Sequence, residues 1–260
     1  MFGTVIIDAY TKDETEQLAT AIDNLCNPTD SYGWASAGLY SFWDYNTHEV
    51  LYIGLASDLA ERFKQHNGLL DMSEGGCKRR QIEDYFTTHD KLGYTIFVQS
   101  PLSQPMVHRN RQQYEKYAAE INTPVKEYVS DQGIADIKRV EGILIEAFNQ
   151  YYGHLPAWNR IGGSIAGQQR VMEHNINIVK CFSNPQEFEI NPIVSRSTIR
   201  ELSNNATYAA YESDLHAVRM YVLMMGLDYE DAFNLAAIFD RYGTYKRIYD
   251  SGYLKKVLVV

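Results

Sequence analysis

The fold is decided by three short strings: Ala37-Gly38-Leu39-Tyr40, then Tyr52-Ile53-Gly54, and then Leu59-Ala60-Glu61-Arg62-Phe63-Lys64-Gln65-His66. Residues 38–43 and 49–55 are short runs rich in aromatic and β-branched side chains, which favour strands. The polar segment between them contains Asp44 and Asn46, residues that favour turns. The first two strings therefore predict a β-hairpin that carries one tyrosine on each strand.

The third string predicts a helix over residues 59–66. Ser57 or Asp58 can cap its start, and Glu61 follows Asp58 at the spacing of a capping box. Arg62 and His66 are four residues apart, so they share a face with the apolar residues of this helix. We expect both side chains to border the buried face and to overhang the sheet that carries the tyrosines.

Tyrosines on neighbouring strands, followed by a helix with Arg and His four apart, resemble the GIY-YIG nuclease family. Leu39 stands where the family motif has isoleucine, a swap that conserves volume. The resemblance implies an α+β fold, in which helices flank a small three-stranded antiparallel sheet. It also implies catalytic roles for Tyr40, Tyr52, Arg62 and His66.

A carboxylate lies within the apolar stripe of an expected helix further along the chain. Glu141 falls among apolar residues at spacings of three and four, namely Ile134, Ile137, Leu144, Phe148 and Tyr151. A buried carboxylate must be neutralised, paired or exposed to a cavity. Residues 141–145 also match the Glu-x-x-Leu-Ile pattern of the family, which implies that Glu141 binds a metal ion. We expect Mg²⁺, for which Mn²⁺ could substitute.

The segment after this helix contains a further candidate. Gly153 ends the helix, Pro156 prevents its return, and Trp158-Asn159 follows. An asparagine in this loop supports the active site and binds phosphate in the family, which implies the same role for Asn159. The alternative is an ordinary loop asparagine.

Composition excludes several classes of protein. The chain has 260 residues and 45% hydrophobic content, enough for one or two domains with a full core. Its three cysteines show no paired spacing, which argues against a zinc site and against a disulfide framework. No apolar run approaches the length of a membrane span, and no basic leader precedes the chain. We expect a cytoplasmic protein of bacterial or phage origin with no membrane partner.

The net charge of −9 is unusual for a protein that binds DNA, but the charge is unevenly distributed. Residues 1–37 carry one lysine against six carboxylates. Backbone phosphate binding needs only a local basic patch. One such cluster is Lys78-Arg79-Arg80, which predicts either DNA contacts or a solvated face.

The pattern along the chain predicts four segments. Residues 1–35 form an N-terminal extension, and residues 36–163 form the nuclease domain, with a helix over 81–89, a third strand over 92–99 and a partly helical insertion at 103–133. Residues 164–195 are expected to be a connector with one strand at 177–182. Residues 196–260 are expected to form an all-helical domain with helices over 198–203, 206–225, 229–242 and 244–251.

The last two of these helices resemble a helix-turn-helix, with the turn around Gly243. The second helix is basic and is expected to expose its polar residues. The candidate DNA-binding residues here are Tyr245, Lys246, Arg247, Lys255 and Lys256. The alternative is a helical bundle used to form a homodimer.

The resemblance implies a Mg²⁺-dependent endonuclease that hydrolyses phosphodiester bonds in DNA, which we expect to be double-stranded. Site-specific cleavage of the restriction or homing type is expected, with Tyr40 favoured as the base that takes the proton of water. Two alternatives remain. One is a structure-specific repair or phage nuclease, and the other is a DNA-binding regulator with an inactive nuclease fold.

Overall fold

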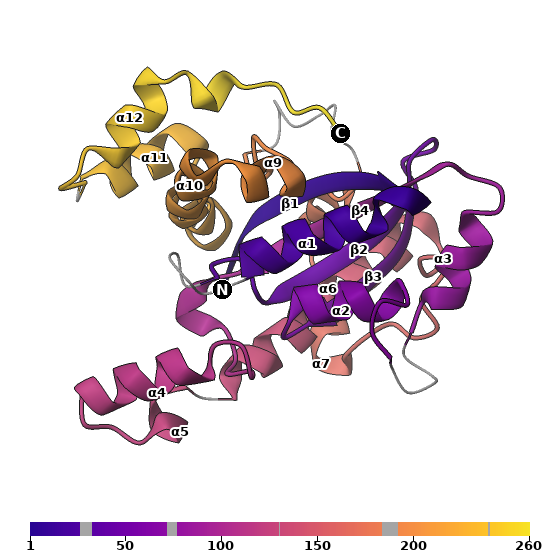
Figure 1. Cartoon of the computed structure of the whole chain (residues 1–260), viewed down its shortest axis with the longest axis horizontal. Coiled ribbons are helices and arrows are strands. Elements are labelled where there is room, and N and C mark those ends of the chain that lie inside the picture. The colour runs from indigo at the N-terminus through magenta and orange to yellow at the C-terminus, as the bar shows by residue number, and fades with distance from the viewer. Residues whose placement is uncertain (27–32, 72–76, 130, 184–191, 239) are drawn as a thin grey trace.

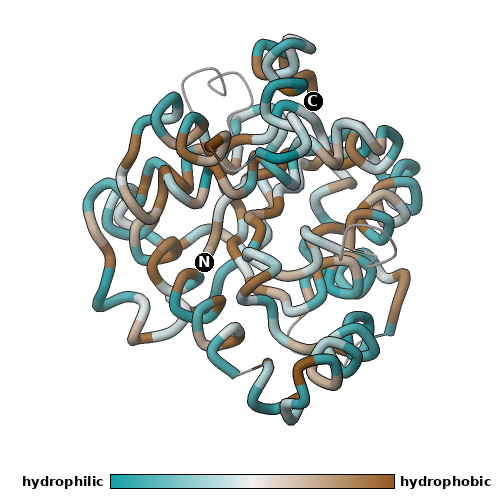
Figure 2. Tube along the Cα trace, turned by 90° about the vertical axis from the view of Figure 1, so that its left-hand side faces the viewer, coloured by the Kyte–Doolittle hydropathy of each residue, from teal (hydrophilic) through white to brown (hydrophobic). Residues whose placement is uncertain are grey.

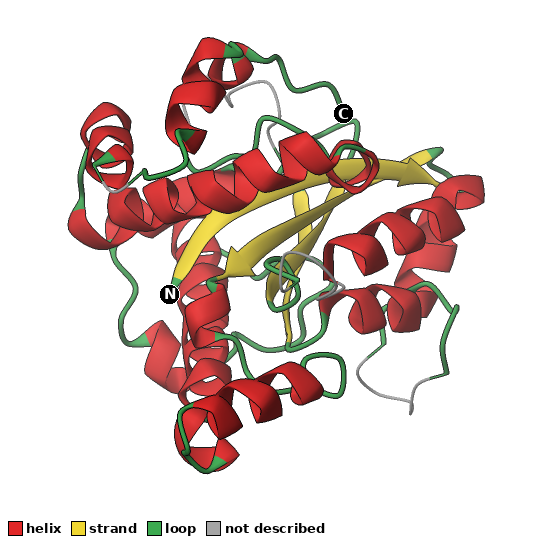
Figure 3. Cartoon of the chain, turned by 60° about the vertical axis from the view of Figure 1, so that its left-hand side comes forward, coloured by secondary structure: helices red, strands yellow, loops and turns green. Residues whose placement is uncertain are grey.

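A computed structural model describes residues 1–26, 33–71, 77–129, 131–183, 192–238 and 240–260. In the described part of the chain, four antiparallel strands form one sheet in the order β1-β4-β2-β3. The strands are β1 (Phe2–Thr11), β2 (Gly38–Asp44), β3 (Val50–Ala56) and β4 (Lys91–Gln99). Helices lie on both faces of this sheet (Figures 1 and 3). The chain therefore has the α+β class that the sequence predicts.

The helices follow in chain order. They are α1 (Thr15–Cys26), α2 (Leu59–His66), α3 (Arg79–Tyr85), α4 (Arg111–Glu120), α5 (Val125–Tyr128), α6 (Gln132–Tyr152), α7 (Ile165–Gln168), α8 (Ile176–Lys180), α9 (Ile199–Asn204), α10 (Ala206–Met225), α11 (Tyr229–Ala237) and α12 (Thr244–Asp250). Short 3₁₀ turns add η1 (Lys12–Glu14), η2 (Pro101–Ser103), η3 (Glu173–Asn175) and η5 (Tyr253–Lys255).

Two hydrophobic cores hold the sheet between the helices. One contains Tyr40 and Phe42 of β2 together with apolar residues of α1, α2, α3 and α9. The other contains Leu39 and Trp43 of β2 together with residues of α6 and α8. Adjacent residues of β2 thus enter opposite cores, as the alternation of side chains along a strand requires. The hydrophilic segments of the chain lie mainly at the periphery (Figure 2).

The hairpin and its helix have the structure that local patterns predict. β2 pairs with β3 so that Tyr40 lies opposite Gly54. The side chain of Asp58 accepts a hydrogen bond from the backbone N–H of Glu61 at 2.9 Å, which caps α2 at its expected start. α3 begins two residues earlier than the expected helix and ends four residues earlier. β4 begins one residue earlier than the expected strand.

The N-terminal residues are part of the sheet, so the prediction of an extension over 1–35 is wrong. β1 pairs along its length with β4, and α1 packs into the same core as Tyr40. The expected three-stranded sheet therefore has a fourth strand. On its other side β1 is covered by a loop, because Val5 exchanges hydrogen bonds with Ile193 and Ser195 at 2.9 and 2.8 Å.

Residues 177–182 are another correction, since a helix lies where a strand was expected. Ile176 and Val179 are three residues apart on α8 and are both buried against α6 and the sheet. The side chain of Asn175 accepts a hydrogen bond from the N–H of Met172 at 2.8 Å, which fixes the turn before α8. Packing onto the core therefore decides a segment whose apolar pattern is short enough for either structure.

The C-terminal residues are helical, as expected, and they pack closely on the N-terminal strand. α10 has the predicted bounds, with Asn205 capping its start and Gly226 in a left-handed conformation at its end. α11 is shorter than expected, and α12 ends one residue early. α10 contacts β1, and α9 contacts α1.

A buried ion pair fixes α10 against β1. Glu212 and Arg219 are 0% and 1% exposed, and Arg219 Nη1 donates to Glu212 Oε2 at 2.6 Å. The same guanidinium donates to Thr4 Oγ1 on β1 at 3.2 Å and to the carbonyl oxygens of Pro192 and Val194. The charge of Arg219 is thus satisfied by both the helix and the strand.

Replacing Arg219 by methionine should destabilise the fold by about 3–5 kcal/mol, because Glu212 would be left buried without its cation. The control is Glu212→Gln combined with Arg219→Met, which removes both charges and should recover a large part of the loss. Chemical denaturation monitored by circular dichroism measures the two values. A loss below about 1 kcal/mol for the single variant would contradict the role assigned to this pair.

Candidate functional site

Four of the residues singled out in the sequence gather on one side of the sheet. Tyr40 comes from β2, Tyr52 from β3, and Arg62 and His66 from α2. The rings of Tyr40 and Tyr52 have centroids 5.8 Å apart, and the Tyr40 and His66 rings are 5.4 Å apart. The hairpin and the helix after it therefore bring two phenols, a guanidinium and an imidazole into one cluster.

Hydrogen bonds fix the proton of the His66 ring. The backbone N–H of Lys78 donates to His66 Nδ1 at 2.9 Å, so Nδ1 carries no proton. Burial lowers the pKa of His66 to about 3, with further contributions from Arg62 and Lys78, so the ring is neutral at pH 7. The single ring proton must then be on Nε2, which donates to the Tyr40 hydroxyl oxygen at 2.6 Å.

The two tyrosines differ in exposure and in acidity. Tyr40 is 2% exposed, and burial raises its pKa well above the ordinary value. Tyr52 is half-buried; burial raises its pKa also, but its hydrogen bond with Tyr40 opposes that shift. The same contact raises the pKa of Tyr40, and because the Tyr40 oxygen already accepts from His66 Nε2–H, its own O–H is available to Tyr52. Tyr40 therefore lies between His66 and Tyr52 and contacts both.

Arg62 is half-buried beside both phenols. Its charge lowers the pKa of Tyr40 and of Tyr52, against the larger effect of burial. A guanidinium next to a phenol stabilises the phenolate and can also bind a phosphate oxygen.

Glu141 lies on α6, close enough to Tyr52 for its charge to raise the pKa of that phenol. Burial raises the pKa of Glu141 to about 7, with Lys138 opposing the shift. Among the described residues the carboxylate makes no hydrogen bond or ion pair. The centre of the predicted stripe is confirmed, since Ile137, Leu144 and Phe148 are buried, whereas Ile134 and Tyr151 at its ends are exposed.

The candidate metal ligand, the carboxylate of Glu141, fits a hard cation whose other ligands are mainly water. In the described part of the chain, no three His, Cys, Asp or Glu side chains are grouped as metal ligands. A single half-buried carboxylate with a raised pKa is still a good ligand for Mg²⁺, which keeps several waters and takes few protein ligands. A cation would also relieve the cost of ionising Glu141 in this position.

Asn159 holds β3 in place beside Tyr52. Its side-chain oxygen accepts from the N–H of Ile53 at 2.9 Å, and its side-chain nitrogen donates to the carbonyl of Ile53 at 2.8 Å. Trp158 adds a third bond to β3, since its backbone N–H donates to the carbonyl of Leu51 at 2.8 Å. Both polar atoms of the Asn159 amide are thus bonded to β3, and they fix the strand next to Tyr52.

Lys78 lies closer to the cluster than the sequence suggested. The side chain was expected among the DNA contacts, but the residue is 7% exposed and its ammonium is 4.7 Å from the centroid of the Tyr52 ring. Burial lowers the pKa of Lys78, with Arg160 contributing. The sequence indicated Lys78 only through its place in the basic run Lys78-Arg79-Arg80. No local pattern there predicts a contact with Tyr52.

The other basic candidates lie on the surface or form ion pairs. Arg79 and Arg80 are exposed, and Arg79 pairs with Glu83 at 2.7 Å. Lys246 pairs with Asp250, and Lys256 pairs with Glu201 at 2.9 Å. Arg247 and Lys255 are exposed.

Tyr245 is half-buried rather than exposed, which corrects that part of the helix-turn-helix prediction. Its hydroxyl donates to the carbonyl of Asp214 at 3.1 Å, and its ring packs on Phe233. This tyrosine therefore joins α12 to α10 and α11.

A scan against models of protein families, a search of curated proteins and a search of solved structures each found no match to this chain. Within the described ranges, none of the helices has the length and apolar character needed to span a bilayer.

Gly54 is required by the close approach of the two tyrosines. A Cβ at this position would lie 2.6 Å from Tyr52 Cε1 and 2.7 Å from the Tyr40 hydroxyl oxygen. Any larger residue would displace Tyr40 from His66. The glycine of the second motif is therefore explained by packing against the first motif.

Gly54→Ala should break the Tyr40–His66 hydrogen bond while the chain stays folded. The proton on His66 Nε2 should then exchange with solvent at least about tenfold faster, the factor that corresponds to one lost hydrogen bond. Nitrogen-15 NMR of the histidine rings measures this exchange. Gly153→Ala is the control for a destabilising change outside the cluster, since its left-handed backbone strains an alanine while nothing lies within 4 Å of a Cβ built there. Unchanged exchange in Gly54→Ala would refute the packing constraint.

Proposed function

We propose that this protein is a metal-dependent endonuclease that hydrolyses phosphodiester bonds in DNA. The observation that carries the proposal is the cluster in which His66 donates to Tyr40, Tyr40 donates to Tyr52, and the Glu141 carboxylate stands nearby, unpaired among the described residues. Hydrolysis of a phosphodiester needs a base for water, a cation for the phosphate and help for the leaving oxygen. The cluster offers a residue for each need.

Tyr52 is the better base of the two tyrosines on this geometry, although the sequence favoured Tyr40. Tyr52 is half-buried whereas Tyr40 is buried, and a Tyr52 phenolate would accept a hydrogen bond from Tyr40. The ammonium of Lys78 over the Tyr52 ring and the nearby Arg62 would stabilise the same phenolate. Tyr52 would then take the proton of the attacking water at its Oη atom.

The remaining residues position the phosphate and the phenols. Arg62 would bind a non-bridging phosphate oxygen, for which its fixed donor geometry is suited. His66 keeps the Tyr40 hydroxyl turned toward Tyr52, and Asn159 keeps β3 in place. Glu141 would hold Mg²⁺, or Mn²⁺ in its place, and the ion supplies positive charge to the phosphate and the leaving oxygen.

The exposed cations of the C-terminal helices support a second contact with DNA. Lys246, Arg247 and Lys255 lie on the surface of α12 and the segment after it. Such a contact would allow site-specific cleavage of the restriction or homing type, whereas a nuclease that reads DNA shape would not need it. A homodimer formed through these helices is the competing proposal for the same surface.

Incubation of the purified protein with phage, plasmid and synthetic DNA tests the proposed activity. Discrete fragments that require Mg²⁺ would support a site-specific nuclease, and cleavage only at branched or flapped substrates would support a repair or phage nuclease. DNA binding without any cleavage would support the regulator. A methyltransferase gene beside the coding sequence would favour restriction, and a position within an intron would favour homing.

Glu141→Gln should abolish Mg²⁺-dependent cleavage and leave DNA binding close to that of the wild type. The same variant should be more stable than the wild type at pH 8 without metal, on the order of 1–2 kcal/mol, because the half-buried carboxylate is then charged. The pKa of Glu141 is raised to about 7, so this difference should appear as the pH rises from about 4.5 through 7 and vanish near pH 4.

Mg²⁺ should reverse that order, because binding to the native carboxylate stabilises the wild type and not the variant. Thermal unfolding with and without Mg²⁺ measures the effect separately from catalysis. Full cleavage by Glu141→Gln, or equal stabilisation of both proteins by Mg²⁺, would refute the assignment of the metal ligand.

Lys78→Met should move the dependence of the cleavage rate on pH toward higher pH. Removal of the ammonium raises the pKa of Tyr52, so less phenolate is present near neutral pH and the rate there falls, by about tenfold if that pKa rises by about one. Lys78→Arg should keep the wild-type profile. Arg79→Met is the matched surface control and should leave the profile unchanged. A uniform loss at every pH in Lys78→Met would indicate a role in binding DNA instead.

A further inference from the structure

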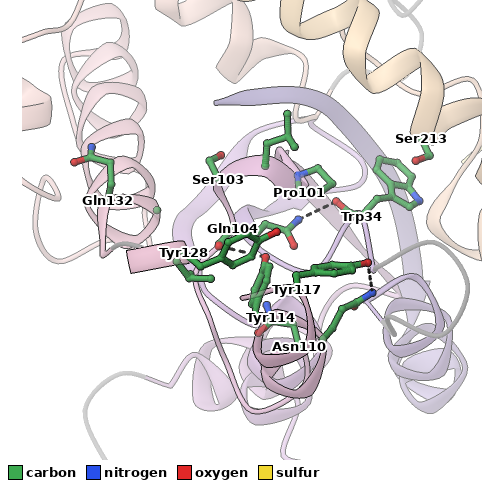
Figure 4. A pocket seen from close by; sticks show the side chains of 14 residues that line it. Trp34, Pro101, Ser103, Gln104, Asn110, Tyr114, Tyr117, Tyr128, Gln132 and Ser213 are labelled. Carbon is green, nitrogen blue, oxygen red and sulfur yellow. Dashed lines mark hydrogen bonds between the residues drawn. The ribbon is translucent and has the colours of Figure 1, made fainter. Parts of the chain in front are cut away.

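A cavity of about 630 Å³ lies outside the catalytic cluster, between the insertion and the N-terminal end of α6. Tyr114 and Tyr117 of α4 and Tyr128 of α5 gather at one side of it, and Trp34 and Ser213 approach from the rest of the chain (Figure 4). Its size is within the range of small-molecule sites.

The chemistry of the wall favours an uncharged ligand. Fourteen described residues line the cavity, and none of their side chains carries a formal charge. Four of them are aromatic: Trp34, Tyr114, Tyr117 and Tyr128. A phosphate would be left without a counter-charge here, whereas an uncharged flat ring could stack on a tyrosine.

The amide side chains of the wall are held by hydrogen bonds within the protein. The amides of Gln104 and Asn110 are held by hydrogen bonds, since Gln104 donates to the carbonyls of Trp34 and Gln99 and Asn110 donates to that of Pro105. These bonds make the floor of the cavity rigid. Gln113 donates to the Tyr117 hydroxyl at 3.1 Å, which fixes the orientation of that phenol. The wall therefore offers a planar ligand mainly the faces of its aromatic rings.

Two helices connect the cavity to the catalytic cluster. Gln132 and Gly133 line the cavity at the start of α6, and Glu141 lies nine residues further on, about 14 Å along the axis. Arg109, next to Asn110 in the wall, pairs with Asp58 at the cap of α2 at 3.1 Å, and the eight residues of α2 lead to His66 over about 12 Å.

We propose that this cavity binds a nucleobase turned out of the DNA strand whose phosphate is held at the catalytic cluster. The assignment to DNA rests on the proposed nuclease function, while the affinity for a base rests on the cavity alone. Proteins that read a base in this way stack it on aromatic rings and contact its polar edge. The insertion would thus supply part of the site preference of the enzyme.

Titration with free nucleosides tests the cavity without any cleavage. Ligand-observed NMR in EDTA should show adenosine, guanosine, cytidine or thymidine binding through its base protons, while ribose 5-phosphate should not bind. Tyr117→Ala should weaken binding at least tenfold, and Tyr117→Phe, which keeps the ring, should stay within threefold of the wild type. Tyr128→Ala provides a second variant if Tyr117→Ala does not fold. Binding of ribose 5-phosphate as tight as that of the nucleosides, or nucleoside binding unaffected by the alanine variants, would overturn the proposal.

A single-stranded oligonucleotide of 20 residues, compared with the same backbone carrying several abasic sites, tests the assignment to DNA. The wild type should bind the complete strand about tenfold more tightly, and Tyr117→Ala should remove that difference. Nucleoside binding with no preference between the two strands would overturn the assignment to DNA. Glu141→Gln should bind nucleosides like the wild type, so failure of the nuclease proposal and failure of the base cavity give different results.

Discussion

The hydrogen bond between the Tyr40 hydroxyl and His66 Nε2 is the contact on which the arrangement of the cluster depends. It joins the β2–β3 hairpin to α2 at a position where both side chains are buried. A polar contact in such surroundings must be satisfied on both sides, and here the backbone of Lys78 satisfies the other nitrogen of the ring. The tautomer of one imidazole therefore links the hairpin, the helix and the loop after it.

The two proposed sites of the chain differ in their chemistry. Cations, phenols and a carboxylate meet at the cluster of Tyr40, Tyr52 and Glu141, while the cavity of the insertion is aromatic and uncharged. Phosphate contacts fix the position of a bound strand, whereas contacts with bases carry information about its sequence. The pair between Arg109 and Asp58 fastens the insertion to α2, so the two regions are held at a defined separation.

Local sequence predicted those elements whose bounds are set by neighbours in the chain. The hairpin, α2 and α10 match because capping by Asp58 and Asn205 and the alternation of β2 act over a few residues. β1 was missed because it becomes a strand by pairing with β4, about ninety residues away. Among the candidate site residues, the two tyrosines could be predicted from the spacing of the motifs. Glu141 could be predicted from its place in the apolar stripe of a helix. The position of Lys78 could not be predicted, because it depends on contacts with His66 and Tyr52 that local sequence does not specify.

The two hydrogen bonds between the Asn159 side chain and the backbone of Ile53 affect how the edge of the sheet can pair with other molecules. β3 is an edge strand, and its unpaired backbone groups would offer a template for a strand of another molecule. The side-chain amide of Asn159 occupies both groups of Ile53, and the backbone of Trp158 occupies the carbonyl of Leu51. At the other edge, Ile193 and Ser195 occupy the backbone of Val5. Part of each edge of the sheet is thus occupied by the chain itself, which leaves fewer backbone groups free to pair with a strand of another molecule.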